Sequence, residues 1–431
     1  MFRTGFYETE VTPPLGSIIP GDFAARHNES ILDPLFARAV VYALDDTALG
    51  IVTIDCCGIT ADIAERIRTR AASYVPLPHD AILVNATHCH GGGPTLNWGE
   101  EVVRDEGYLD FLVCRAADAL ITAYGRMQDC ELRSGTDELR GYAFIRDFHM
   151  KDGSMKTNPG VGNPNIDRPT TEPDPEVRVI AAFGADGKPF GALVNFACHP
   201  AIVASNITSA DYIGALSRRM KELYGPDFVT VFLNGACGNI NHVNPFDPAS
   251  VRKGIHIELG RALADRAALA IRKAEAIPEK LACAFSTVNL RLRKPTTEQV
   301  LAAKAVYDAL GDDAEKSVPR TKGYVETFFA WQAFGALRDR RMFIDLPVQV
   351  LTVGGVTVFG CPCQIFVEYG RALKAGAPGA MVCAFSNDYG GYVPTPDCMV
   401  PGIYEARLAT TSQLEPEAGG KLVAALLALC G

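Results

Sequence analysis

The sequence lacks the features of membrane, secreted and nucleic-acid-binding proteins. No stretch reaches the roughly 20 uninterrupted apolar residues of a membrane span. No basic stripe is present, and the net charge of -9 argues against binding to nucleic-acid phosphates or anionic lipids. Because no apolar secretory segment follows Met1, a cytoplasmic location is expected. The expected partner is a small-molecule substrate. The composition is compatible with either a monomer or a homo-oligomer.

The thirteen cysteines are an odd number and are scattered along the chain, with Cys56 and Cys57 adjacent. Such a distribution is not typical of a disulfide framework and indicates free thiols in a reducing compartment. The sequence also lacks a four-cysteine zinc cluster, and Cys361-Pro362-Cys363 is not a C-x-x-C motif. Cysteine therefore supplies no obvious metal site.

Apolar strand-like runs alternate with helical stretches throughout the chain, which predicts an α/β fold of mixed sheets covered by helices. No Gly-, Ser- or Pro-rich linker and no internal repeat divides it, so we expect a single domain over 1–431. The segment 157–175 is dense in Pro, Asn and Gly and predicts a long irregular loop. The segment 295–341 predicts a helical excursion, which either covers a cleft or forms a plain surface hairpin.

The predicted elements are strands over 39–44, 49–54, 81–85, 179–183, 192–197, 229–233, 348–353, 356–360 and 381–386, and helices over 59–72, 108–125, 210–224, 251–276, 297–310 and 323–340.

Two of the eight histidines stand two residues apart at the end of the apolar run 81–85. On an extended strand, His88 and His90 would point to the same face. Imidazole is the commonest neutral metal ligand, and the glycines that follow allow a sharp turn near a ligand. The pattern therefore indicates either a metal site or a pair of buried, hydrogen-bonded histidines.

Three other strand ends carry polar residues beside glycine or proline. His199-Pro200 follows the run 192–197, Asn241-His242 follows 229–233, and Tyr389 and Tyr392 follow 381–386. Because α/β proteins place ligand sites at strand exits, we expect these turns to converge on one pocket. The simplest assembly is one zinc ion held by His88 and His199, with an open position for a water molecule.

Three of these turns resemble motifs of the neutral/alkaline non-lysosomal ceramidase family, in its bacterial ceramidase-like branch. They are Thr87-His88-Cys89-His90 with the turn to Pro94, Asn195 to Pro200, and Gly391-Tyr392-Val393-Pro394-Thr395. The resemblance runs along the whole chain and implies the catalytic domain of that family, without its C-terminal immunoglobulin-like domain. It further implies a zinc-dependent amidase.

Carried over by motif, the resemblance implies metal ligands at His88, His199 and Tyr392. It also implies catalytic roles for His90 and Arg146 beside the substrate carbonyl, and for Tyr392 in stabilising negative charge.

The sequence departs from the family pattern at two positions. Gln364 stands where the family has a glutamate ligand. This leaves three alternatives. The neutral amide oxygen of Gln364 binds the metal, or the missing charge comes from Cys363, Asp55, Asp211 or Glu368, or the metal has been lost. Asn241 replaces the family's serine, which argues against a serine nucleophile but leaves a hydrogen-bond donor for an oxyanion.

The leading hypothesis is therefore a metal-dependent hydrolase of an amide bond in a small soluble substrate, with a metal-activated water as nucleophile. One alternative is a hydrolase or isomerase acting on an ester, lactone or glycosidic bond, because fold does not fix chemistry. The other is a metal-free binding protein that retains the pocket.

Overall fold

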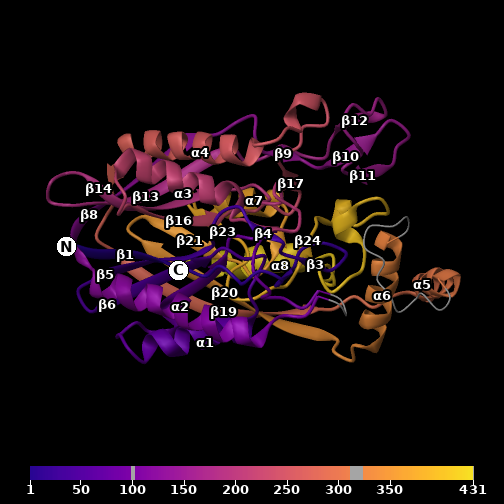
Figure 1. Cartoon of the computed structure of the whole chain (residues 1–431), viewed down its shortest axis with the longest axis horizontal. Helices are drawn as coiled ribbons and strands as arrows, with labels where there is room; N and C mark the ends of the chain where they lie inside the picture. The colour runs from indigo at the N-terminus through magenta and orange to yellow at the C-terminus, as the bar shows by residue number, and fades with distance from the viewer. Residues whose placement is uncertain (99–101, 311–323, 431) are drawn as a thin grey trace.

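A computed structural model describes residues 1–98, 102–310 and 324–430 of the chain. Two β-sheets stack face to face, and helices cover the outer face of each (Figure 1). The apolar cores lie between these layers. The predicted α/β class, with mixed sheets covered by helices, is confirmed.

The larger sheet consists of β1 (Phe2–Glu10), β5 (Phe36–Leu44), β6 (Thr47–Ile54), β7 (Ile82–Ala86), β8 (Gln128–Glu138), β13 (Glu176–Phe183), β14 (Pro189–Phe196), β16 (Val229–Asn234) and β18 (Glu275–Ala276). Its order is β16-β14-β13-β8-β1-β5-β6-β7, with β18 paired to β8. The pairs β6–β7 and β14–β16 at its two edges are parallel, and the pairs between them are antiparallel.

The central strands are apolar on both faces because both faces are buried. In β5, Ala39 and Val41 pack against the helices, whereas Val40 and Tyr42 pack against the second sheet. A strand covered on both sides reads as a continuous apolar run rather than an alternating one. This explains why the sequence runs 39–44, 49–54 and 192–197 were recognisable as strands.

The second sheet has the order β19-β20-β21-β23. Its strands are β19 (Leu281–Arg291), β20 (Phe343–Val353), β21 (Val356–Gly360) and β23 (Met381–Cys383). One face packs on the larger sheet, and the other is covered by α7 (Val367–Gly376) and α8 (Ala418–Ala428).

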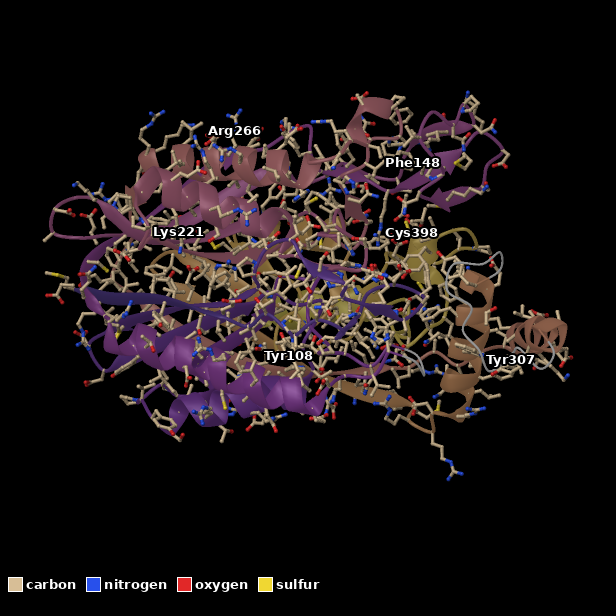
Figure 2. All side chains as sticks on the ribbon, viewed as in Figure 1. Tyr108, Phe148, Lys221, Arg266, Tyr307 and Cys398 are labelled. Carbon is tan, nitrogen blue, oxygen red and sulfur yellow. The ribbon has the colours of Figure 1, made fainter. Side chains whose placement is uncertain are left out.

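The larger sheet is covered by α1 (Ala61–Ala72), α2 (Glu106–Gly125), α3 (Asp211–Tyr224) and α4 (Ile255–Arg272). Each buries an apolar stripe on the sheet and turns charged side chains outward. Arg266, for example, lies on the outer face of α4, whereas Tyr108 near the start of α2 is buried (Figure 2). None of the described helices combines the length and apolar character needed to cross a bilayer.

The segment predicted as one long irregular loop, 157–175, is irregular over 158–165 and 170–175, but the prediction is wrong at 166–169, where a short strand interrupts it. Two short strands in this region, β11 (Met155–Thr157) and β12 (Ile166–Pro169), flank β10 (Asp147–Met150) in a three-stranded sheet. The strands are too short for a period of two to show in the sequence, and the glycines and prolines lie in the turns between them.

The remaining strands are short pairs near the strand exits. They are β2 (Ile18–Ile19) with β3 (Arg26–His27), β4 (Ser30–Ile31) with β15 (Ile207–Thr208), β9 (Phe144–Ile145) with β17 (Ile240–Asn241), and β22 (Gln364–Ile365) with β24 (Tyr392–Val393).

Within the predicted excursion 295–341, α5 (Thr297–Leu310) and α6 (Tyr324–Arg338) lie at one end of the molecule (Figure 1); residues 311–323 fall outside the described part of the chain.

The edges of the large sheet approach each other where their strands end. Asn234, at the end of β16, donates a side-chain hydrogen bond of 3.1 Å to the carbonyl of Thr87, which follows β7. The second sheet joins the same junction, because Ala86 N–H donates to Phe385 O, at 3.1 Å, and Ala384 N–H donates to Asn234 O, at 2.9 Å. The exits of β7, β16 and β23 therefore meet at one place, as the sequence predicts.

Candidate metal centre

His88 does not continue the strand that precedes it. β7 ends at Ala86, and His88 has a φ of +69°, in the left-handed region that costs a non-glycine residue about 1–3 kcal/mol. Its ring stacks on Phe385 at 4.0 Å, and its Nδ1 lies 2.5 Å from the Cys57 carbonyl oxygen. The expectation that His88 and His90 share a face of an extended strand is therefore wrong, because a turn aims both rings.

Three imidazoles meet at the strand exits. His88 Nε2 lies 3.1 Å from His199 Nε2, and His90 Nε2 lies 3.2 Å from the same atom. His199 follows β14, and the carbonyl of Pro200 accepts a hydrogen bond from His90 N–H, which ties the two turns together. The structure thus brings together three of the four histidines that the sequence singled out at these turns, whereas His242, after the run 229–233, is not part of the cluster.

The tautomer of His88 follows from its hydrogen bond. Because the Cys57 carbonyl can only accept, the proton of His88 lies on Nδ1, and Nε2 turns a lone pair toward His199. Burial lowers the pKa of His88 to about 3. Burial lowers the pKa values of His90 and His199 well below the ordinary value, and repulsion from the Arg146 guanidinium acts in the same direction. All three rings are therefore neutral near pH 7, the state in which imidazole binds metals.

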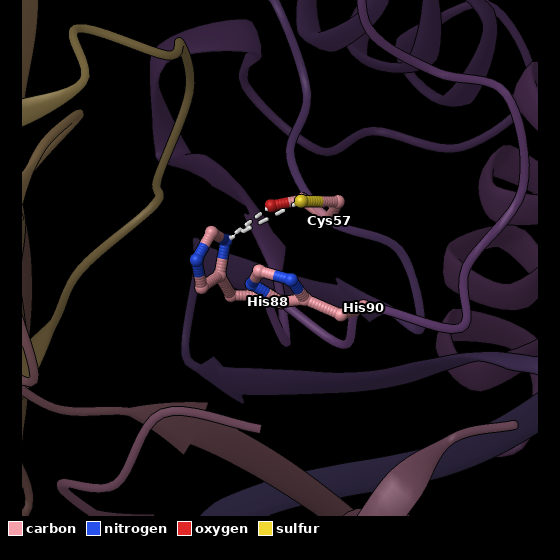
Figure 3. Close-up of side chains that lie close together, drawn as sticks. All are labelled: Cys57, His88 and His90. Atoms are coloured by element: carbon pink, nitrogen blue, oxygen red, sulfur yellow. Dashed lines mark hydrogen bonds between the residues drawn. The ribbon is translucent and has the colours of Figure 1, made fainter. Parts of the chain in front are cut away.

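Cys57, which the sequence analysis did not select, also lies in this cluster. Cys57, His88 and His90 offer possible ligand atoms that lie within 4.8 Å of one another (Figure 3). The Cys57 Sγ, however, is 3.9 Å from His88 Nδ1, the nitrogen that carries the proton. Burial raises the pKa of Cys57 to about 12, so it is a thiol in the protein alone. The signal in the sequence was its place just after the predicted strand 49–54.

Gln364 is fully buried beside the imidazoles. Its Nε2 donates to the Tyr389 hydroxyl at 2.5 Å, whereas its Oε1 has no hydrogen-bond partner among the described residues. Burial lowers the pKa of His88, whereas the Cys57 carbonyl and the Gln364 side chain act in the opposite direction and raise it. A buried amide oxygen with no donor is costly, and a cation at this place would satisfy it.

Tyr392 and Arg146 form the wall next to His199. The Tyr392 ring lies parallel to that of His199 at 6.4 Å, and β24 pairs with β22 so that Tyr392 is beside Gln364. Burial raises the pKa of Tyr392 to about 12, so its hydroxyl is protonated. The Arg146 guanidinium carbon lies 5.4 Å from the centre of the Tyr392 ring, and its Nη2 is 2.5 Å from Glu405 Oε1.

These side chains open into a cavity of about 650 Å³. Its polar lining includes His90, His199, Arg146 and Tyr392, and its aromatic lining includes Trp98. Val325 on α6 also lines it, so the helical excursion contributes to the cavity wall. The volume is typical of a pocket for a small molecule.

The carboxylates and thiol considered as sources of the missing charge are engaged elsewhere. Asp55 pairs with Arg38 at 2.7 Å, and Asp211 accepts two backbone N–H bonds of 2.8 Å. Glu368 accepts from Asn239 at 3.1 Å, and Cys363 packs in the core of the second sheet.

Asn241 has both ends of its side-chain amide occupied. It donates to Asn158 Oδ1 and accepts from Val243 N–H, each at 2.9 Å. Asn241 is not among the residues that line the cavity, whereas Asn158 is. The expected role of Asn241 as an oxyanion donor therefore finds no support in this arrangement, because its amide is used to hold the loop at Asn158.

Searches with protein-family models and among curated proteins found no match to the chain. Among solved structures, the chain is similar to a structure described as ceramidase complexed with C2, with a TM-score of 0.74 and 18% identity over 99% of this chain and 74% of that one. It is similarly related to the neutral ceramidase of Pseudomonas aeruginosa, with a TM-score of 0.73 and 19% identity over the same shares. The resemblance inferred from the sequence motifs is thus confirmed at the level of structure, and the chain has the neutral-ceramidase fold over nearly its whole length.

Proposed function

We propose that this protein is a metal-dependent hydrolase of a carbon–nitrogen amide bond in a small soluble substrate. The observation that carries the proposal is the convergence of His88, His90 and His199, with Nε2 separations of 3.1 and 3.2 Å, where His90 and His199 line the cavity. The likeness to ceramidase structures supports the reaction class, and zinc suits a site built on imidazole nitrogens.

The donor set fits one cation. At a zinc–nitrogen distance of 2.0–2.1 Å, two ligands of a tetrahedral site lie about 3.3 Å apart, close to the separations observed. His88 presents an unprotonated Nε2, and Gln364 presents a buried oxygen that lacks a donor. His88, His199 and Gln364 would hold the ion, with Tyr392 beside them. When bound, such an ion polarises a carbonyl oxygen and lowers the pKa of water.

The protein's own groups would bind and orient the amide. Arg146 has a buried Nε–H with no hydrogen-bond partner in the described chain, and Tyr392 keeps its phenolic proton at neutral pH. Both can donate to a carbonyl oxygen as negative charge develops on it. His90 is the least buried of the three imidazoles and lines the cavity, so it can hold or accept a proton from water there.

The test is turnover of a small chromogenic anilide, 4-nitroacetanilide, by purified protein with its metal content measured. We expect about one bound divalent ion per chain, and loss of activity after chelation that returns when zinc is restored. His88→Ala should lose both metal and turnover, whereas His79→Ala, which changes a half-buried histidine at the opposite end of β7, should keep both. Unchanged turnover after complete chelation would overturn the proposal.

A further inference from the structure

A group of polar side chains lies next to Arg146: two buried carboxyl groups, Asp147 and Glu405, and the half-buried Thr157, which lines the same cavity as His90 and His199. Asp147 and Glu405 are both 0% exposed. The Thr157 hydroxyl lies between them, 2.5 Å from Asp147 Oδ1 and 2.9 Å from Glu405 Oε2. It also accepts a hydrogen bond of 2.9 Å from the backbone N–H of Tyr404. Two buried carboxyl groups thus share one half-buried hydroxyl at the lining of the cavity.

The single hydroxyl proton of Thr157 limits how many of the two carboxyl groups can be ionised. A hydroxyl has one proton to donate and two lone pairs that accept. The Tyr404 N–H uses one lone pair, so the hydroxyl can donate to one carboxyl group and accept from one more donor. Since an ionised carboxylate only accepts, both contacts are hydrogen bonds only when one carboxyl group carries a proton.

The surroundings place that proton on Asp147. Glu405 Oε1 forms an ion pair of 2.5 Å with Arg146 Nη2, which favours its ionised form. Asp147 Oδ2 is buried with no hydrogen-bond partner among the described residues, which would leave a carboxylate poorly satisfied. Burial and the charge of Glu405 both raise the pKa of Asp147 well above its ordinary value. The direction of the bonds is then Asp147 to Thr157 to Glu405.

We propose that the carboxyl groups of Asp147 and Glu405 hold a single carboxyl proton between them, and that Asp147, Thr157 and Glu405 act as positioning residues that fix the Arg146 guanidinium at the wall of the cavity. This role rests on the proposed function, in which Arg146 binds the carbonyl oxygen. Arg146 is held at two points, Glu405 Oε1 and the Gly238 carbonyl, the latter at 2.6 Å. The proton on Asp147 directs the Thr157 hydroxyl to Glu405, which keeps that carboxylate aimed at Arg146.

Ionisation of Asp147 would break the arrangement. Two carboxylates would then compete for one hydroxyl proton, and Glu405 would lose either its bond to Thr157 or its fixed orientation. The charged and titratable groups that face Asp147 are Glu405, Arg146, Glu368 and Cys398. Only Arg146 among them is a cation, and it is already paired with Glu405. Activity should therefore fall on the alkaline side as Asp147 loses its proton.

Infrared spectroscopy of the metal-free protein tests the shared proton without any need for turnover. Wild type should show the carbonyl band of an un-ionised carboxyl group at neutral pH, and Asp147→Asn should lose it. Asp152→Asn, which changes an exposed residue bonded only to its own turn, is the matched control and should keep the band. Absence of the band in wild type, or its loss in Glu405→Gln but not in Asp147→Asn, would overturn the assignment.

Hydrolysis of the anilide tests the positioning role. Asp147→Ala should lower kcat more than tenfold with a smaller change in KM. Asp147→Asn should recover most of that loss, because its amide can still donate to Thr157, and its pH profile should lack the alkaline decline. An unchanged alkaline decline in Asp147→Asn would overturn the positioning role. Absence of turnover in wild type would sink the proposed function instead, and the infrared result would still decide the shared proton.

Discussion

Replacing His199 by alanine should remove most of the thermal stabilisation that zinc gives to this protein. His199 is the shared member of the imidazole cluster, since its Nε2 lies within 3.1 Å of His88 and 3.2 Å of His90. Its replacement leaves two imidazoles with no ring between them. We expect metal affinity to fall by at least the 10–100-fold that is typical of changes around a metal site.

The expected magnitude follows from linkage and from the size of the chain. Zinc at 100 times its dissociation constant stabilises the folded state by about 2.7 kcal/mol. The entropy of unfolding for 431 residues, at about 2.1 cal/mol/K per residue, is roughly 0.9 kcal/mol/K. The melting temperature of wild type should therefore rise by about 3 °C. A 100-fold weaker site at the same zinc concentration gives about 0.4 kcal/mol, or about 0.5 °C.

The assay is thermal unfolding by circular dichroism, with and without zinc, on chelator-stripped protein. His79→Ala is the matched control, because His79 is half-buried and ion-paired with Glu65 away from the cluster. It should show the full rise of wild type. If His199→Ala kept the whole shift, or if His79→Ala lost it, zinc would be binding elsewhere and the proposed metal centre would be wrong.

Three further changes test the site and its support. Gln364→Glu should raise zinc affinity about tenfold, roughly 1.4 kcal/mol, because it adds a negative charge where a neutral oxygen now lies. Competition with a chelator measures the affinity, and an unchanged value would argue that Gln364 does not face the ion. Gly238→Ala should destabilise the protein by about 1–3 kcal/mol in urea unfolding, because the added Cβ would lie 2.5 Å from the backbone carbonyl oxygen of Gln364. Gly420→Ala should change the stability little, because its added Cβ has no atom within 4 Å. In metal-free protein, His88 alone should lower the free energy of unfolding by up to about 1.4 kcal/mol per pH unit as pH decreases from 6.5 toward its pKa of about 3, because the unfolded chain gains a proton that the buried ring does not. His88→Gln should reduce the slope of stability against pH by that amount, and an equal slope in both proteins would contradict this prediction.

Much of the fold could be predicted because burial leaves a strong pattern in the sequence. The run 356–360 predicts β21 with its observed bounds, and 297–310 predicts α5 likewise. Other elements differ by a few residues at their ends; the helix predicted over 251–276 is Ile255–Arg272. The short strands β11 and β12 could not be predicted, because elements of three or four residues carry too little periodicity.

The sequence by itself determined which strand exits carry imidazoles, since His88 and His199 each follow an apolar run closed by glycine or proline. Hydrophobic patterning is local, so it is legible in one dimension. Only the tertiary structure decided how the rings face one another, through the left-handed turn at His88 and the Cys57 carbonyl that fixes its tautomer. It alone brought Glu405 to Arg146 and Thr157, which lie 259 and 248 positions away in the chain. Such contacts form between side chains whose separation in sequence carries no repeating signal, and they exist only once the sheets have packed.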